Sequence, residues 1–198
     1  MSGFLQPVAL HGRHVTLEPL SLAHEPEAVE AVQDGALWRL WTTTVPAPDQ
    51  MRAGIEARLK LQQQGSMLPF AVRDATGRFA GMTTFMNADA THRRVEIGST
   101  WYRQSAQRTP LNTEAKLLLL AHAFEAWHCI AVEFRTHWFN QASRAAIARL
   151  GAKQDGVLRN HQRLPDGSLR DTVVFSIIES EWPAVKAHLT HQLSRPRD

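Results

Sequence analysis

Cysteine, tyrosine and long apolar runs are scarce in this sequence. Its 198 residues include one cysteine and one tyrosine. The single cysteine, Cys129, excludes an internal disulfide. A membrane-spanning helix needs about 20 consecutive apolar residues, and no such run is present. The N-terminus also lacks a basic segment followed by an apolar one, so no secretory signal is predicted. We expect a soluble, cytoplasmic protein without a membrane partner.

An excess of one charge is absent as well. The formal net charge is +3, with 22 Lys and Arg against 19 Asp and Glu, and the basic residues are mostly scattered. This pattern does not indicate a nucleic-acid partner, which would need a concentrated basic surface. With 43% hydrophobic and 21% charged residues, the length fits one globular domain over residues 1–198.

Metal-ligand patterns are weak. His11 and His14 are spaced like ligands, and so are His188 and His191, but neither pair comes with a third ligand or an HExxH context. We interpret all four as surface histidines and predict no metal. We interpret Cys129 as a buried small apolar residue, because no orienting carboxylate motif lies near it in the sequence.

The spacing of apolar residues predicts alternating strands and helices. The expected elements are a strand in 8–20, helices over 21–34 and 48–64, a hairpin over 67–73 and 78–87, a central strand over 94–102, a helix over 115–127, a strand over 130–138, a short helix from Asn140 to Gly151, a hairpin turning at 164–167 and a helix from Ser180. Alternation along the central strand places Val95, Ile97 and Trp101 on one face and Glu96, Thr100 and Tyr102 on the other.

The segment after the central strand combines a basic loop with a helix start. The loop over 103–111 carries two arginines, and Asn112 is the predicted N-cap of the helix, with Glu114 as an early acid. Because the N–H groups of a helix N-terminus point outward and carry partial positive charge, this arrangement suits a phosphate.

The same segment resembles a known family. Trp101-Tyr102, residues 107–115, Leu117-Leu118-Leu119 and Ala123-Phe124-Glu125 are similar to the GNAT superfamily of N-acetyltransferases, in the branch of the ribosomal-protein alanine acetyltransferases. The resemblance implies an α/β (α+β) fold with a mixed, largely antiparallel sheet of about seven strands flanked by helices. It further implies that the fourth and fifth strands splay apart, so that their unpaired backbone groups can bind a pantetheine arm.

The activity implied by the resemblance is direct transfer of an acetyl group from acetyl-CoA to a primary amine. The acceptor is either a protein N-terminus or a small-molecule amine, and a homodimer is left open. A non-catalytic module that binds CoA is the alternative. The implied contacts are Trp101 and Tyr102 with the pantetheine, Arg108, Thr109, Leu111, Asn112 and Thr113 with the diphosphate, and Asn140 with the thiol end.

The phosphate loop departs from the family pattern at two positions. Arg108 and Pro110 stand where the family has glycines. Proline has no N–H for a phosphate oxygen, and arginine adopts positive φ less easily than glycine does. We expect the charge of Arg108 to offset the donor lost at Pro110 through a contact with the diphosphate.

Glu96 and Ser143 are the candidate catalytic residues. Some family members place a general base where Glu96 stands; the alternative is a solvated carboxylate paired with Arg94 or Arg135. Ser143 follows Asn140 by three residues, as in the ribosomal-protein branch, where the serine faces the sulfur. A serine hydroxyl is a poor acid, so we expect it only to hydrogen-bond the thiolate; helix capping is the alternative role of this pair.

Two tryptophans lie in the connection that helps to wall the acceptor site in the family. Trp38 and Trp41 are therefore candidate substrate-binding residues. The alternative for both is a place in the core. Three threonines and a proline follow closely after Trp41, which favours the pocket for that residue.

Overall fold

A mixed sheet forms the centre of the protein. The structure is a computed structural model that describes residues 4–164 and 166–195. Within these residues the sheet has eight strands in the order β1-β2-β3-β4-β5-β6-β8-β7. The strands are β1 (Leu10–His11), β2 (Val15–Pro19), β3 (Met67–Asp74), β4 (Phe79–Asp89), β5 (Arg94–Tyr102), β6 (Ala131–His137), β7 (Lys153–Arg163) and β8 (Leu169–Ile178). The expected seven become eight because the first predicted strand is a small hairpin, β1 with β2.

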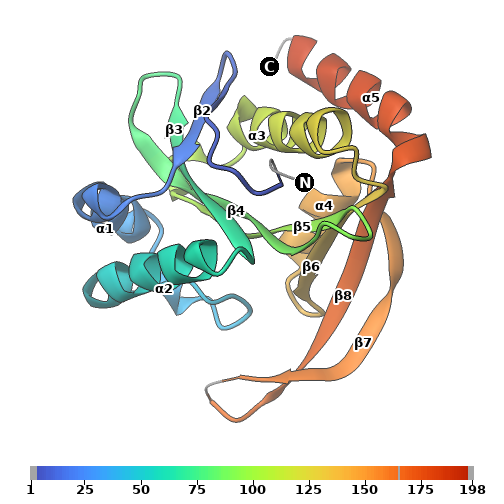
Figure 1. Cartoon of the computed structure of the whole chain (residues 1–198). Helices are drawn as coiled ribbons and strands as arrows, with labels where there is room; N and C mark the ends of the chain where they lie inside the picture. The colour runs from blue at the N-terminus through green and yellow to red at the C-terminus, as the bar shows by residue number, and fades with distance from the viewer. Residues whose placement is uncertain (1–3, 165, 196–198) are drawn as a thin grey trace.

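Helices cover both faces of this sheet (Figure 1). Helices α1 and α2 lie on one face, and α3 and α5 lie on the other. The helices are α1 (Glu25–Gln33), α2 (Met51–Gln63), α3 (Pro110–Ala121), α4 (Gln141–Arg149) and α5 (Trp182–Ser194). A single π-helical turn, His122–Ala126, continues α3. The predicted α/β architecture is confirmed.

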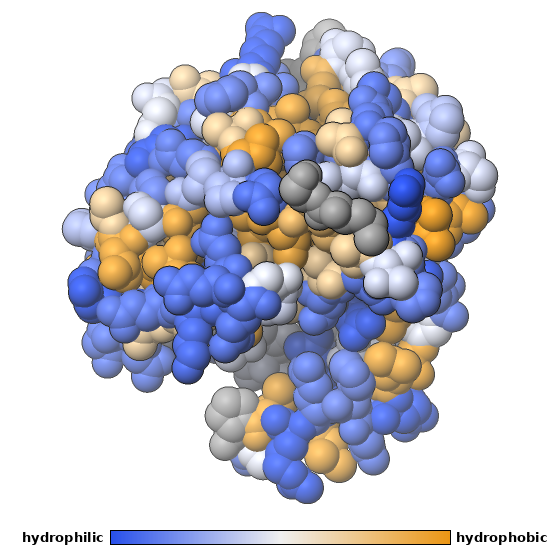
Figure 2. All heavy atoms as spheres, viewed as in Figure 1, coloured by the Kyte–Doolittle hydropathy of each residue, from blue (hydrophilic) through white to orange (hydrophobic). Residues whose placement is uncertain are grey.

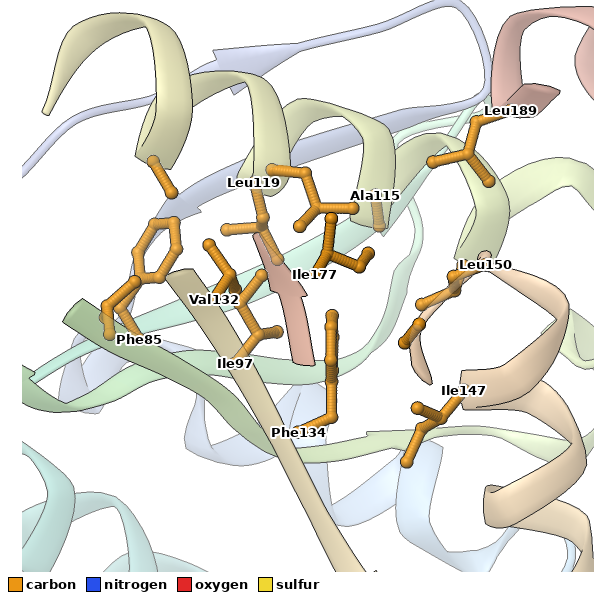
Figure 3. Close-up of a cluster of buried hydrophobic side chains, with 14 of the residues drawn as sticks. Phe85, Ile97, Ala115, Leu119, Val132, Phe134, Ile147, Leu150, Ile177 and Leu189 are labelled. Atoms are coloured by element: carbon orange, nitrogen blue, oxygen red, sulfur yellow. The ribbon is translucent and has the colours of Figure 1, made fainter. Parts of the chain in front are cut away.

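The larger core lies between the sheet and α3. Ala115 and Leu119 of α3 point toward the strands, where they face Ile97 of β5 and Val132 of β6 (Figure 3). Leu119 and Val132 are fully buried. Burying such a side chain stabilises a fold by about 1.5 to 3 kcal/mol, so the apolar face of α3 holds the helix against the sheet.

Strands β5 and β6 form the parallel pair of the sheet, and their registered pairing is short. Three pairs are formed, from Arg94 with Ala131 to Glu96 with Glu133. Beyond this point β5 remains paired with β4, and β6 remains paired with β8. Figure 1 shows β4 and β5 running across the view while β6 and β8 run down it. That the ends of β5 and β6 hold a pantetheine arm stays a prediction.

The predicted orientation of Trp101 is wrong. Trp101 packs in the core beneath α1 and α2, whereas Val95 and Ile97 belong to the core beneath α3. Two residues of β5 oppose one residue of β4 just before Trp101, and the first of them, Ser99, has a φ of 49°. Such a β-bulge reverses the alternation of side chains that follow it. Tyr102 therefore lies in the α3 core and not on the polar face.

The predicted N-cap of the long helix is also wrong, by three residues. Helix α3 begins at Pro110, and Thr109 is its N-cap, with Thr109 Oγ1 accepting a hydrogen bond from Leu111 N. Asn112 lies within the first turn. Proline is favoured at the first helical position because the N–H that it lacks would have no partner within the helix. The donor lost at Pro110 is therefore not one that the helix itself requires.

Strands β7 and β8 form a hairpin that projects from the body of the molecule (Figure 1). Most of the residues of β7 are exposed. Of the predicted turn at 164–167, Pro165 lies outside the described residues. Figure 2 shows mainly hydrophilic residues on the projecting part, with hydrophobic residues among them.

Candidate active site

Glu96 is a buried carboxylate at the point where β5 and β6 stop pairing. Its side chain is 7% exposed. Asn87 Nδ2 donates a hydrogen bond to Glu96 Oε2 over 2.7 Å, and Arg135 Nε lies 3.5 Å from the same oxygen. Of the two ionic partners considered from the sequence, Arg135 is therefore present, while Arg94 pairs with Glu133 instead. The carboxylate is not solvated.

The two neighbouring carboxylates of β5 and β6 have opposite pKa shifts. Burial raises the pKa of Glu96, and the hydrogen bond from Asn87 and the charge of Arg135 lower it only in part. Burial also acts on Glu133, but hydrogen bonds from Arg94 and Arg135 outweigh it and lower the pKa. Opposite shifts in neighbouring groups are a common feature of acid–base sites, where the group with the raised pKa accepts a proton.

The loop before α3 keeps a backbone path that favours glycine. Arg108 has a φ of 61°, in the left-handed region. The exposed Arg108 side chain extends from this strained position, and Thr109 and Pro110 then begin the helix. The first N–H groups of a helix have no intrahelical partner. Pro110 has no N–H and Leu111 N is bonded to Thr109 Oγ1, so the N–H groups of Asn112 and Thr113 are the first-turn donors for an anion. The loop geometry thus fits a diphosphate although both family glycines are replaced.

A hollow of about 240 Å³ lies beside this loop, and we do not assign the diphosphate to it. Thr109 and Leu111 line one side, and Asp74 and Thr76 of the β3–β4 turn line the other. Burial raises the pKa of Asp74, but hydrogen bonds from Thr76 and Arg78 outweigh burial and keep it ionised. A fixed negative charge repels a phosphate, so the backbone of the loop is the better anion site.

Trp101 and Tyr102 are in the cores and not on a ligand-binding surface. The two residues are 5% and 8% exposed, respectively. Neither Trp101 Nε1 nor the Tyr102 hydroxyl has a hydrogen-bond partner among the described residues. Burial raises the pKa of Tyr102, so its hydroxyl stays protonated. Only backbone groups of these two residues remain available for a pantetheine arm.

Asn140 and Ser143 form the start of α4. Asn140 is the N-cap, and its Oδ1 accepts a hydrogen bond from Ser143 N at 3.0 Å. The alternative role as a helix cap is therefore present in the structure. The Asn140 amide N–H₂ and the half-buried Ser143 hydroxyl can still bind a ligand.

The connection between α1 and α2 forms a second hollow with the β7–β8 hairpin. This hollow has a volume of about 210 Å³, with residues 38–44 on one side and Leu164, Asp166 and Arg170 on the other. Trp38 and Trp41 both line it. Trp38 also packs against the α1–α2 core, whereas Trp41 is 59% exposed. Trp41 thus lines the hollow from an exposed position, and its role in binding the acceptor stays a prediction.

Sequence reasoning missed His137 and Lys116, two buried polar residues. His137 Nδ1 accepts a hydrogen bond from Phe139 N at 3.0 Å, and the rings of Trp41 and Phe139 pack on His137. Lys116 lies in α3 with its ammonium buried against β4 and β5. A histidine in a strand and a lysine in a helix carry no distinctive spacing, so the sequence offered no signal for either.

Comparison with known proteins decides the family. A profile described as an acetyltransferase (GNAT) domain matches residues 14–153. These residues include the predicted base, the phosphate loop and the Asn140–Ser143 pair. The chain belongs to the GNAT acetyltransferase family. The resemblance seen in the sequence is therefore confirmed, as is the predicted enzyme class at the level of the family.

Similar proteins extend this GNAT assignment over nearly the whole chain. A crystal structure from T. thermophilus, provisionally described as an acetyltransferase, is 37% identical, with a TM-score of 0.84, and covers 95% of this chain and 98% of that one. Mycobacterium smegmatis RimJ in complex with CoA-disulfide is 23% identical, covers 95% and 96% of the two chains and has a TM-score of 0.80, which supports the fold.

A curated relative is similar to part of the chain. YdaF of Bacillus subtilis (strain 168), provisionally named a ribosomal N-acetyltransferase, is 29% identical over 110 residues. The match covers 56% of this chain and 59% of YdaF, so it spans less than two thirds of that relative.

Cys129 is not a candidate nucleophile. Burial raises the pKa of Cys129 to about 11, which leaves the thiol protonated and unreactive. Among residues 4–164 and 166–195, no helix is long and apolar enough to cross a membrane. The same residues contain no group of three or more His, Cys, Asp or Glu side chains that could hold a metal ion.

Proposed function

We propose that this protein is an acetyl-CoA-dependent N-acetyltransferase whose acceptor is the α-amine of a protein or peptide. The observation that carries the proposal is the buried Glu96, with its raised pKa, where β5 and β6 cease to pair. An acceptor ammonium must lose a proton before it can attack a carbonyl, and a carboxylate with a raised pKa is a suited base. The name of YdaF supports the choice of a protein acceptor.

Each step of the transfer has a candidate group in the chain. Acetyl-CoA supplies the acetyl group as a thioester when it is bound. Glu96, held by Asn87, accepts the proton of the acceptor amine. Backbone N–H groups near the Ser99 bulge stabilise negative charge on the carbonyl oxygen. As the amide forms and the carbon–sulfur bond breaks, the nitrogen loses its second proton to the departing thiolate, which accepts a hydrogen bond from the Ser143 hydroxyl. No side chain of the enzyme is acetylated in this scheme.

Binding of the cosubstrate uses the loop before α3 and the start of α4. The positive φ of Arg108 and the first turn of α3 provide backbone donors for a diphosphate, and the Arg108 guanidinium adds charge. Asn140 binds the pantetheine through its amide. RimJ of M. smegmatis, which has the same fold, was solved with CoA-disulfide, and this supports CoA as the ligand.

The proposal is tested by binding and turnover on one sample. Isothermal titration with acetyl-CoA and CoA measures binding, and thiol release then measures transfer to a panel of peptides, their N-terminally blocked counterparts and small amines. We expect micromolar binding, and thiol release with open but not with blocked peptides. Glu96→Gln should bind CoA normally and lose roughly 100-fold or more in kcat/KM. The matched control is Glu56→Gln, on the exposed side of α2.

The outcomes separate the alternatives. Absence of CoA binding would refute the proposal altogether. Binding without thiol release on any amine would instead favour a non-catalytic CoA-binding module. Thiol release with small amines alone would support acetyl transfer but would show that the acceptor is a small molecule and not a peptide.

A further inference from the structure

Lys116 is a buried cation without a counter-ion among the described residues. Only 6% of the surface of Lys116 is exposed to solvent. Lys116 Nζ donates hydrogen bonds to Thr100 Oγ1 at 2.9 Å and to Thr83 Oγ1 at 3.2 Å, and these hydroxyls lie 2.8 Å apart. Both partners are neutral. Buried ammonium groups are normally paired with an acid, so this buried charge calls for an explanation.

The ammonium lies toward the end of the sheet where the phosphate loop begins. Thr100 stands near the C-terminal end of β5, just before the loop that leads to α3. Lys116 is six residues after Pro110, or about 9 Å along the helix, and helical side chains lean toward the N-terminus. The lysine therefore extends back beneath the first turn of α3, on its sheet-facing side.

We propose that Lys116 is a buried counter-charge for the diphosphate of CoA, and that the protein takes up a proton as CoA binds. The inference rests on the proposed function, because it needs the diphosphate at the loop before α3. Lys116 acts through space and through the interior of the protein, without touching the ligand. The attraction between the lysine charge and the diphosphate charge is stronger across the protein interior than across water, because the interior has a lower effective dielectric constant.

The direction of the proton uptake follows from burial. Burial lowers the pKa of Lys116 from 10.5 to about 7. At pH 7 to 8 the lysine is therefore neutral in a fraction of the protein molecules. A nearby anion favours the charged form and raises this pKa, which draws a proton from solution. The affinity for CoA should consequently fall as the pH rises above about 7.

Groups facing Lys116 from the packed elements do not compete in this range. Strand β4 contributes the hydroxyl of Thr83. Strand β5 contributes Thr100 and Tyr102, and burial raises the pKa of Tyr102, so it stays neutral. On α3 itself, Glu114 accepts hydrogen bonds from the backbone N–H groups of residues 13 and 14 and so is directed at the β1–β2 turn.

Calorimetry of CoA binding in two buffers with different ionisation enthalpies measures the linked protons directly. The full chain would be compared with Lys116→Arg, which keeps the charge but cannot lose its proton, and with Lys116→Met, which has neither. The 3′-phosphate of CoA titrates equally in all three, so differences belong to residue 116. We expect the wild type at pH 7.5 to take up roughly half a proton more than Lys116→Arg. Lys116→Met should bind CoA about five- to tenfold more weakly at pH 7.

The surface variant Lys60→Met, in α2, is the matched control and should leave uptake and affinity unchanged. Proton uptake equal in the wild type and Lys116→Arg would overturn the inference, and this comparison decides the case even if Lys116→Met does not fold. CoA binding that shows no linked proton would likewise overturn the inference and leave the proposed function intact. Absence of CoA binding to the wild type would refute the proposed function and the inference with it.

Discussion

Asn87 Nδ2 donates a hydrogen bond to Glu96 Oε2 over 2.7 Å, from β4 to the neighbouring β5. The bond favours the charged form of a carboxylate that burial would otherwise keep protonated. Asn87 has a φ of 48°, so glycine can replace it without strain. This pair sets the pH range in which Glu96 can act as a base.

Asn87→Gly should move the acid limb of the kcat/KM profile upward by about one pH unit. Glu96 is active when ionised, so activity is lost as the pH falls through its pKa, and loss of the hydrogen bond raises that pKa. Thiol release measured from pH 5 to 9 tests this. Asn160→Gly removes another asparagine at positive φ, in β7, and should leave the profile in place.

Arg108→Ala and Arg108→Gly should have equal effects on CoA binding and unequal effects on stability. Both remove the guanidinium, and each should weaken CoA binding by about 1 to 3 kcal/mol, measured by titration. Glycine relieves the φ of 61°, so the glycine variant should be about 1 kcal/mol more stable than the alanine variant in urea. Unchanged CoA affinity in both variants would exclude a phosphate contact by this side chain.

Asn140→Ser should separate capping from ligand binding. Serine caps a helix about as well as asparagine, so the free energy of unfolding should stay within about 0.5 kcal/mol of wild type. Serine lacks the amide N–H₂, so CoA binding should weaken. Asn140→Ala should lose binding and, in addition, about 1 kcal/mol of stability. If Asn140→Ser binds CoA normally, the residue is a cap alone.

Trp41→Ala should raise the KM for the acceptor and leave CoA affinity unchanged. Trp41 is 59% exposed and lines the hollow between residues 38–44 and the β7–β8 hairpin. The ring centroids of Trp41 and His137 lie 5.0 Å apart. We expect a three- to tenfold change, about 1 kcal/mol, in steady-state thiol release with a peptide acceptor. Leu61→Ala, an exposed apolar residue of α2, is the control. An equal rise in the KM for acetyl-CoA would place Trp41 elsewhere in the mechanism.

Lys116→Met should stabilise the protein at low pH relative to high pH. The folded-state pKa of about 7 lies below the unfolded value of 10.5, so the folded protein holds the buried charge at a cost below pH 7. Between pH 7 and 10.5 the folded protein has lost the proton of Lys116, whereas the unfolded chain still holds it. Because the unfolded state binds more protons in this range, the stability of the wild type rises with pH relative to a chain without this lysine. The advantage of the methionine variant should shrink by about 1 to 3 kcal/mol from pH 6 to pH 9 in urea unfolding. A constant difference would mean that Lys116 does not titrate in the folded state.

The sequence by itself determined the order of the elements and the family. Periods of 2 and 3.6 residues are local properties of strands and helices, so β3 to β6 and the helices α2, α4 and α5 lie close to where they were predicted. The motif between residues 101 and 125 determined the resemblance to GNAT proteins in the same way. The helix end at Gly151 and the cap at Asn140 also depend on neighbouring residues alone.

Only the tertiary structure decided the orientation and ionisation of the site. The bulge at Ser99 placed Trp101 and Tyr102 on faces opposite to those predicted, because it depends on the pairing with β4. The burial of Glu96 and Lys116 likewise depends on strands and helices that are distant in the sequence. A pKa responds to the medium and charges around a group in space, and no local pattern of residues contains that information.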